Sequence, residues 1–149
     1  MFTVAVLPGC SSLSKKSDDN RNVSSVQNVD VFEKIDLGGR SQQIWARGND
    51  AAKPLLLFLH GGPGEPHLNL AAAETNLLKA DYIVVQWDQR GACASYSPEI
   101  SPKELTIRQL EDDAHELIVY LLHRFGKEKL FLLGHSWGSS LGLRVAHDY

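Results

Sequence analysis

The stretch Lys129-Leu-Phe-Leu-Leu-Gly-His-Ser-Trp-Gly138 is a run of apolar residues followed at once by the pattern Gly-x-Ser-x-Gly. The apolar run predicts a strand covered on both faces, and residues 139–149 have a helical pattern. A serine between a buried strand and a helix is the context of a nucleophile elbow, a sharp turn that lifts the hydroxyl out of the sheet. Small residues at Gly134 and Gly138 relieve the crowding of such a turn. The pattern therefore indicates Ser136 as a catalytic nucleophile; a glycine-rich turn without a reactive role is the alternative.

A second glycine-rich loop, His60-Gly-Gly-Pro-Gly-Glu-Pro66, follows another apolar run, Pro54–Leu59. Acyl transfer builds negative charge on a carbonyl oxygen, and fixed N–H donors at that point contribute about 3–4 kcal/mol each in the transition state. One donor is expected from Trp137, the residue after the nucleophile, and the other from this loop. Alone the loop is typical of a tight turn, but together with the elbow it predicts an oxyanion hole.

A third loop, Trp87-Asp-Gln-Arg-Gly-Ala-Cys-Ala-Ser95, follows a further predicted strand and should lie at the same edge of the sheet, where ligands bind in open α/β folds. We expect Asp88 and Arg90 to be structural, as a local ion pair or a turn brace. Cys93 is expected to be a packed thiol, because no positive neighbour is apparent to stabilise a thiolate.

From Val31 onward the sequence alternates between strand and helix patterns, which predicts an α/β fold with a mostly parallel sheet and flanking helices. Strands are predicted at Val31–Leu37, Gln43–Arg47, Pro54–Leu59, Tyr82–Trp87 and Lys129–Leu133, and helices at Leu68–Ala80, Ile107–Phe125 and Ser139–Tyr149. The first two strands should form a hairpin through Gly38-Gly39.

The pattern of the helix Ile107–Phe125 is the clearest, with apolar residues on one face at i, i+3, i+4 spacing. Thr106 and Gln109 are expected to form a capping box at its start, and Gly126 to end it. Its acidic residues are expected to form a solvated face; they are Glu111, Asp112, Asp113 and Glu116.

The first 30 residues differ from the rest. Residues 1–10 form a short apolar segment that ends in Leu-Pro-Gly-Cys10, and residues 11–30 are mostly polar. This arrangement resembles the end of a bacterial lipoprotein signal followed by a disordered tether, which would make Cys10 a lipidation site and place the protein at the cell envelope. The alternative is a frayed N-terminus of a cytoplasmic protein with an idle cysteine. The predicted folded domain is residues 31–149.

Composition excludes several classes of function. The 149 residues contain 15 Lys and Arg against 18 Asp and Glu, a net charge of -3 without a basic stripe, so nucleic acid is not an expected partner. No apolar run reaches the ~18 residues of a membrane helix. Cys10 and Cys93 make neither a disulfide framework nor a Cys-x-x-Cys site, and neither a metal nor another cofactor is expected. The oligomeric state stays open.

The three motifs, His-Gly-Gly-Pro-Gly, Trp-Asp-Gln-Arg-Gly and Gly-x-Ser-Trp-Gly, in this order, resemble the α/β-hydrolase superfamily and especially its proline iminopeptidase branch. The resemblance covers about Val31 to Tyr149. It implies that Ser136 is acylated, that the N–H groups of Gly62 and Trp137 form the oxyanion hole, and that the substrate is a small molecule or a short peptide. Ester, amide and lactone substrates stay open. Epoxide hydrolases and haloalkane dehalogenases would have an aspartate at the elbow, and Ser136 argues against both.

In this superfamily the acid and the histidine of the triad follow the serine, but only His147 and Asp148 do so here. His147 is 11 residues beyond Ser136, about 16 Å along a helix, which is outside hydrogen-bond reach. We therefore expect the N-terminal half of a hydrolase, without the C-terminal strands and the lid, and nearly inactive because loss of the triad histidine costs on the order of 10⁶ in kcat. The alternative is a non-catalytic binding protein or a decayed gene product.

The resemblance also implies the order of the five predicted strands. Numbered along the chain, they should lie in the order 1-2-4-3-5, with Lys129–Leu133 at a bare apolar edge. Such an edge would be prone to aggregation.

Overall fold

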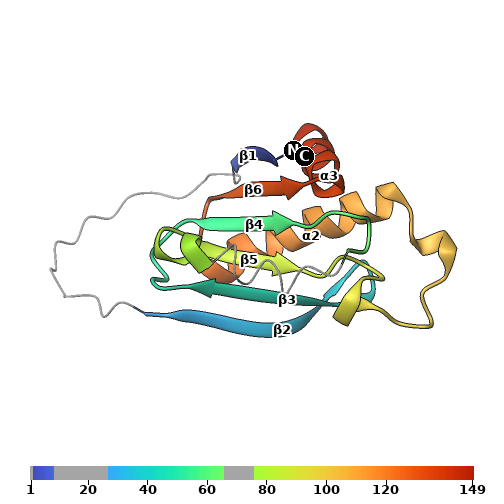
Figure 1. The fold of residues 1–149 in the computed structure, drawn as a ribbon, viewed down its shortest axis with the longest axis horizontal. Coiled ribbons are helices and arrows are strands. Elements are labelled where there is room, and N and C mark those ends of the chain that lie inside the picture. The colour runs from blue at the N-terminus through green and yellow to red at the C-terminus, as the bar shows by residue number, and fades with distance from the viewer. Residues whose placement is uncertain (1, 9–26, 66–75) are drawn as a thin grey trace, which may run out of the picture.

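The computed structural model describes residues 2–8, 27–65 and 76–149, which form a six-stranded sheet with helices packed against it (Figure 1). The strands are β1 (Phe2–Pro8), β2 (Val29–Leu37), β3 (Arg40–Gly48), β4 (Leu55–Leu59), β5 (Ile83–Trp87) and β6 (Lys129–His135). Their order across the sheet is β1-β6-β4-β5-β3-β2. From β6 to β2 this is the order that the resemblance implied, so the predicted α/β-hydrolase arrangement is confirmed.

The centre of the sheet is parallel. Strand β4 pairs in parallel with both β5 and β6, whereas β2 and β3 form the antiparallel hairpin at one edge. Every residue of β4 and of β5 is buried, as the continuous apolar runs predicted. Because β4, β5 and β6 run in the same direction, the three motif loops that follow them begin at one edge of the sheet.

The helices agree with the predicted ones in part. Helix α2 (Ile107–Phe125) has the predicted bounds, and α3 (Trp137–Asp148) begins two residues earlier than predicted. The short helices η1 (Asn76–Ala80), η2 (Cys93–Ser95) and η3 (Pro102–Glu104) are of the 3-10 type. Helix η1 forms the end of the predicted helix Leu68–Ala80; residues 68–75 lie outside the described part of the chain.

Helix α2 packs its apolar face on the core. Thr106 is its N-cap, and the Thr106 hydroxyl accepts from the N–H of Gln109 at 3.1 Å. The predicted capping box is only half formed, because the Gln109 side chain donates to Asp113 Oδ1 at 2.9 Å instead of turning back to Thr106. The helix ends at Gly126, where φ is +61°, a left-handed conformation that favours glycine.

The predicted solvated face of α2 is wrong for two of its four acidic residues. Glu111 and Asp113 are buried, with 3% and 0% of their surface exposed. Arg144 of α3 donates to Glu111 Oε1 at 2.9 Å, and Asp113 pairs with Arg90. Both carboxylates are therefore compensated by arginines that lie far away in the sequence, which a helical pattern alone does not reveal.

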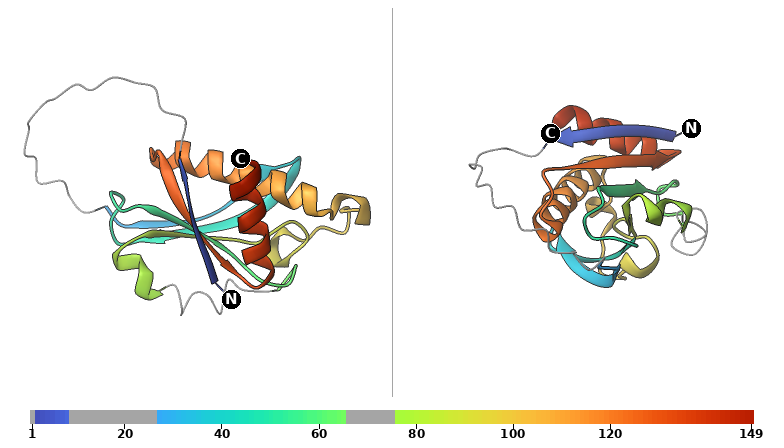
Figure 2. Two further views of the ribbon diagram at one scale, coloured as in Figure 1. Left: turned by 90° about the horizontal axis from the view of Figure 1, so that it is seen from above. Right: turned by 90° about the vertical axis from the view of Figure 1, so that its left-hand side faces the viewer.

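The expected bare edge at β6 is also wrong. Strand β1 pairs antiparallel with β6 along its whole length, from Phe2 opposite His135 to Pro8 opposite Lys129. Figure 2 shows β1 running beside β6, next to α3. The backbone of β6 is thus paired on both sides. Cys10 and most of the predicted tether fall within residues 9–26, outside the described residues.

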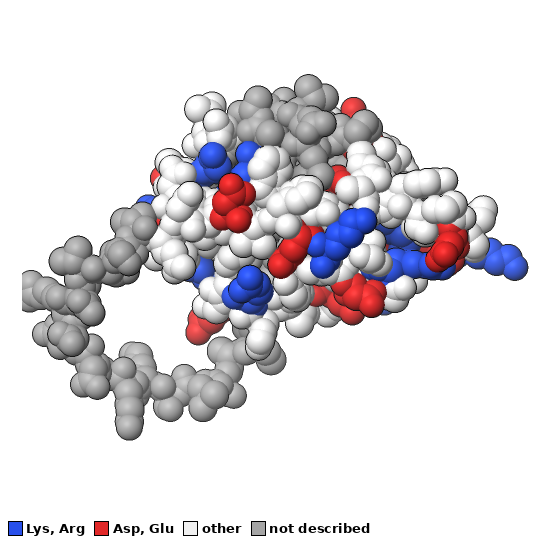
Figure 3. All heavy atoms as spheres, turned by 90° about the horizontal axis from the view of Figure 1, so that it is seen from below, with Lys and Arg blue, Asp and Glu red and all other residues white. Residues whose placement is uncertain are grey.

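Two surface properties bear on partners. Of the helices in the described ranges, none combines the length and the apolar character needed to cross a membrane. On the face shown in Figure 3, acidic and basic side chains are interspersed, without a large patch of one sign.

Candidate active site

Ser136 occupies the sharp turn between β6 and α3, the position that its motif predicted. Its φ is +51° and its ψ is -115°, an unusual conformation for a residue with a side chain. Such backbone strain costs about 1–3 kcal/mol and persists where the surrounding structure enforces it, which is frequent at active sites. The backbone at Ser136 therefore makes the sharp strand-to-helix turn that the motif predicted, called the elbow below.

The two glycines of the motif allow this turn to pack. A Cβ at Gly134 would lie 2.5 Å from the carbonyl oxygen of Gly138, and a Cβ at Gly138 would collide with the carbonyl oxygen of Leu59. Because Leu59 is the last residue of β4, the start of α3 touches the end of β4 directly. The elbow consequently lies against the loop that follows β4.

That loop begins with His60, which is buried and uses both ring nitrogens within the loops. Nδ1 lies 2.8 Å from the carbonyl oxygen of Gly61 and is assigned as the donor, because Nε2 accepts from the N–H of Gln89 at 3.2 Å. His60 therefore holds two loops together, which is a structural role.

Gln89 connects all three motif loops. Its Nε2 donates to the carbonyl oxygen of His60 at 3.1 Å, and its Oε1 accepts from Nε1 of Trp137 at 3.0 Å. The sequence predicts structural roles for Asp88 and Arg90 on either side, but not for Gln89. The signal for Gln89 is its place inside one of the three motifs, two residues after a predicted strand.

Gly62 and Trp137, the expected oxyanion donors, are on the two backbone segments that meet at Ser136. Trp137 is the first residue of α3, so its N–H is one of those that a helix leaves without an intrahelical partner. Gly62 has φ +112°, and a Cβ there would lie 2.6 Å from the N atom of Gly64. A Cβ at the preceding Gly61 would lie 3.3 Å from Ser136 Cβ. The loop thus passes beside the serine, and glycine is required for its path.

The loop after β5 is held by buried polar groups. Asp88 is 1% exposed, and its Oδ2 accepts from the N–H of Ala94 at 3.0 Å. Burial raises the pKa of Asp88, an effect that the hydrogen bond from Ala94 only partly offsets. The expectation of a packed thiol at Cys93 is wrong, because Cys93 is exposed. Desolvation together with the charge of Asp88 still raises the pKa of its thiol, so it is a poor candidate for a thiolate.

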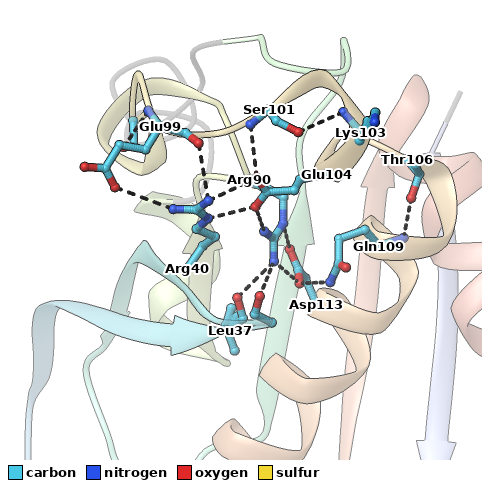
Figure 4. Close-up of polar contacts among 12 residues, drawn as sticks. Leu37, Arg40, Arg90, Glu99, Ser101, Lys103, Glu104, Thr106, Gln109 and Asp113 are labelled. Atoms are coloured by element: carbon cyan, nitrogen blue, oxygen red, sulfur yellow. Dashed lines mark hydrogen bonds and ion pairs between the residues drawn. The ribbon is translucent and has the colours of Figure 1, made fainter.

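Asp88 and Arg90 were expected to form a local ion pair or to brace the turn. The ion pair between these two residues is not formed. The Arg90 guanidinium pairs with Asp113 of α2, and Nη2 donates to the carbonyl oxygens of Leu37 and Gly38 at 3.1 and 3.0 Å (Figure 4). Arg90 thereby fixes the loop after β5 to α2 and to the β2–β3 hairpin. The role is structural, as expected, but the partner is distant in sequence.

A histidine and a carboxylate do pair in the structure, but away from the elbow. His147 Nδ1 lies 2.7 Å from Asp148 Oδ1 at the last turn of α3, and the His147 side chain is 88% exposed. Ser136 precedes the first turn of the same helix, so this pair does not reach it.

Comparison with known proteins agrees with this geometry. Residues 54–149 match the alpha/beta hydrolase fold family. The chain is 40% identical over 119 residues to a probable aminopeptidase, YbaC, of Bacillus subtilis, a match that covers 80% of this chain and 37% of the relative. The chain therefore spans well under half the length of that relative.

Solved structures give the same picture. The crystal structure of a proline iminopeptidase-related protein from Thermus thermophilus superposes with a TM-score of 0.66 at 25% identity, covering 81% of this chain and 41% of that one. Epoxide hydrolase A of Mycobacterium thermoresistibile gives a TM-score of 0.60 at 26% identity, covering 78% and 34%. The fold is thus shared by hydrolases with different reactions.

Proposed function

This chain belongs to the α/β-hydrolase fold family, and we propose that it is the part of a serine hydrolase that carries the nucleophile. The observation that supports this most strongly is the strained backbone of Ser136 between β6 and α3, beside the loop that contains Gly62. Similarity to the Bacillus aminopeptidase supports a proline iminopeptidase-like aminopeptidase as the activity of the whole protein. A serine at the elbow favours this over the epoxide hydrolase reaction.

In the proposed reaction Ser136 Oγ attacks the carbonyl carbon of an ester or amide, and a base takes the hydroxyl proton. The carbonyl oxygen becomes an oxyanion that accepts hydrogen bonds from the N–H groups of Gly62 and Trp137. The leaving group departs with a proton, and water then releases the acyl group from the serine. The bonds from Gln89 to Trp137 and to His60 keep the two donor segments in place.

The base is not His60, because both of its ring nitrogens are used by the loops. The match covers 37% of the Bacillus relative. We propose that the histidine and the acid of the triad belong to the region that corresponds to the unmatched part of that relative. The 149 residues alone should then be a very slow catalyst, with the nucleophile and the oxyanion donors present but without the base.

The test is covalent labelling of the 149-residue chain with a fluorophosphonate, whose phosphorus bonds to the serine oxygen as fluoride leaves. We expect slow labelling at Ser136, located by peptide mass spectrometry, and faster labelling when imidazole is added as an external base. Ser136→Ala should abolish labelling. Ser139→Ala is the matched control, since Ser139 Oγ already donates to the carbonyl oxygen of Gly134 at 2.8 Å. Equal labelling of wild type and Ser136→Ala, or none with imidazole present, would overturn the proposal.

A further inference from the structure

We propose that strand β2 is a docking edge for a second copy of this chain, so that two copies pair through their β2 strands about a two-fold axis at Phe32. The proposal is independent of the proposed function, because β2 and the strand that leads to Ser136, β6, lie on opposite sides of the central strands β4 and β5 (Figure 1). It concerns a partner of the protein rather than its chemistry.

The outer edge of β2 has unpaired backbone groups. Among the described strands, β2 comes last in the order of the sheet and pairs with β3 alone. Lys34 lies opposite Gln43 of β3, and both backbone groups of Gln43 point away from β2. The Gln43 N–H donates to Ser95 Oγ at 2.8 Å, and its carbonyl oxygen accepts from the N–H of Asp88 at 3.0 Å. Because hydrogen-bonded and non-hydrogen-bonded pairs alternate along antiparallel strands, the backbone groups of residues 30, 32, 34 and 36 point away from β3. A further strand can pair with this row of N–H and C=O groups.

The side chains of the same residues lie on one face of the sheet and are exposed. Glu33 accepts from the Tyr120 hydroxyl of α2 at 2.8 Å, so the odd-numbered residues of β2 face that helix and the even-numbered ones face away. Asp30 and Lys34 are exposed, and Phe32 between them is 62% exposed. An aromatic ring between two opposite charges is therefore presented along an unpaired edge.

These charges limit which strand can pair with β2. In residues 2–8, 27–65 and 76–149, neither Asp30 nor Lys34 takes part in an ion pair; Asp30 accepts from the neutral Trp45 Nε1 at 2.8 Å. Opposite charges that face each other across two strands stabilise the pairing, and like charges destabilise it. The edge of β2 thus favours a partner that places opposite charges against its own.

A second copy of β2 meets this condition when the two-fold axis lies at Phe32. Asp30 of each copy then lies opposite Lys34 of the other, the two Phe32 residues face each other, and the outward backbone groups form hydrogen-bonded pairs. Moving the axis by one residue in either direction removes both charge pairs. A register with Lys34 opposite Asp36 also pairs opposite charges, but it overlaps only over residues 33–37, whereas the axis at Phe32 pairs residues 29–35. The edge is therefore self-complementary, as a two-fold interface requires.

Sedimentation equilibrium of charge variants tests this pairing. We expect the 149-residue chain to form a reversible dimer at concentrations up to about 1 mM, since an interface of two strand edges is small. Asp30→Lys makes lysine face lysine, and Lys34→Asp makes aspartate face aspartate. Each variant alone should dimerise at least about tenfold more weakly, because two pairs change from attraction to repulsion. An equimolar mixture of the two variants should recover the dimer, because every lysine then faces an aspartate. The Asp30→Lys variant also provides a background in which association through the opposite edge, at β6, can be measured alone.

Asp36→Lys is the matched control, with the same change of charge on the same face of β2, and it should leave the dissociation constant of the dimer nearly unchanged. A wild type that stays monomeric at about 1 mM, or a mixture that associates no better than the separate variants, would overturn the proposal. A larger effect of Asp36→Lys than of Asp30→Lys would overturn the axis at Phe32.

Cross-linking provides an independent measurement of the register. Phe32→Cys should form a disulfide-linked dimer under mild oxidation, beyond the level of the wild type with its Cys10 and Cys93, because opposite hydrogen-bonded residues have Cα atoms about 5.5 Å apart. Glu33→Cys should not, since residues 33 of the two copies are offset by two positions along the paired strands. Equal cross-linking of the two variants would contradict this register.

Discussion

Arg90 and Asp113 form a fully buried, two-point ion pair between the loop after β5 and helix α2. Arg90 Nε donates to Asp113 Oδ2 and Nη2 donates to Oδ1, both at 2.7 Å, and the two side chains are 1% and 0% exposed. Gln42 Nε2 also donates to Asp113 Oδ2 at 2.8 Å. The pair positions the loop that contains Gln89, and through Gln89 it supports the two backbone segments beside Ser136.

Removing one charge of this pair should strongly destabilise the fold. Asp113→Asn leaves the Arg90 guanidinium buried with its main counter-charge gone, which typically costs about 3–5 kcal/mol. The free energy of unfolding in urea measures the loss. Asp112→Asn is the control, because the neighbouring Asp112 side chain is 44% exposed and pairs with an exposed arginine, so about 1 kcal/mol or less is expected. Equal losses in the two variants would contradict the structural role of Arg90.

Acid should weaken a second ion pair, between Arg40 and Glu104, which lies near the pair of Arg90 and Asp113. Arg40 donates to both oxygens of Glu104, at 2.8 and 3.0 Å, and the N–H of Ser101 donates to Oε1 at 3.0 Å (Figure 4). These bonds lower the pKa of Glu104 from 4.5 to about 2. Because the folded state has the lower pKa, the pair stabilises the fold above pH 4.5, and this stabilisation is lost as the pH falls toward 2.

Glu104→Gln should therefore be less stable than wild type at neutral pH. The difference in the free energy of unfolding should shrink as the pH falls from 4.5 toward 2. Urea unfolding at several pH values measures it. Glu99→Gln is the comparison, since the Glu99 side chain is 80% exposed and lies 3.7 Å from Arg40 Nη1. If the two variants respond to pH in the same way, the short bonds to Glu104 are not the cause.

Gly138, which lets the start of α3 pack against the end of β4, should tolerate no side chain. A Cβ at Gly138 would meet backbone atoms, including the carbonyl oxygen of His60 at 2.7 Å, which cannot move without displacing β4 or its loop. Gly138→Ala should cost about 3 kcal/mol or more. Gly142→Ala, one turn further along α3, would meet only Leu59 Cδ1 at 3.3 Å and gains helix propensity, so a change within about 1 kcal/mol is expected. Thermal or urea unfolding of the pair compares them directly.

Gln89→Leu should affect the reactivity of Ser136 as well as stability. The variant leaves the Trp137 indole N–H and the His60 carbonyl oxygen without their partner, at a cost of about 1–3 kcal/mol. The segments that contain Gly62 and Trp137 then lose their connection through Gln89, so labelling of Ser136 in the presence of imidazole should slow. Gln86→Leu is the control: Gln86 is equally buried on β5 and accepts from Arg47 Nη2 at 3.0 Å, away from the elbow. A similar slowing in both variants would mean that general destabilisation is responsible.

Local patterns predicted strands β2 to β6, helices α2 and α3 and the turn at Ser136, but not strand β1, which occupies residues expected to be a signal remnant. The apolar runs before each loop identified β4, β5 and β6, and the glycines of Gly-x-Ser-x-Gly identified the turn at Ser136, because a short-range steric requirement determines both. The order of the strands required the resemblance to known hydrolases. No local pattern could supply it, since the pairing of β5 with β3 joins segments about 40 residues apart.

The errors about polar side chains have a common physical origin. Asp113 was expected to be solvated because its helical position lies off the apolar stripe, but its burial depends on Arg90, 23 residues away. Gln109 matched a capping box, yet its amide found Asp113 as a competing acceptor. A polar residue's environment is set by long-range partners, whereas the patterns of hydrophobicity and turns are local.

Strand β1 should protect the protein from self-association through β6, because it covers the edge of the sheet at that strand. Its backbone pairs with β6 from Phe2 to Pro8, so deletion of residues 2–8 should leave the β6 backbone unpaired along that edge. An unpaired apolar edge strand is a template for pairing with another chain. Sedimentation velocity should therefore show concentration-dependent dimers or larger species for this deletion. Deletion of residues 12–18, of the same length but outside the strand, should sediment like the wild type. If removal of residues 2–8 leaves the chain monomeric at every concentration, β1 is not what protects the edge of the sheet.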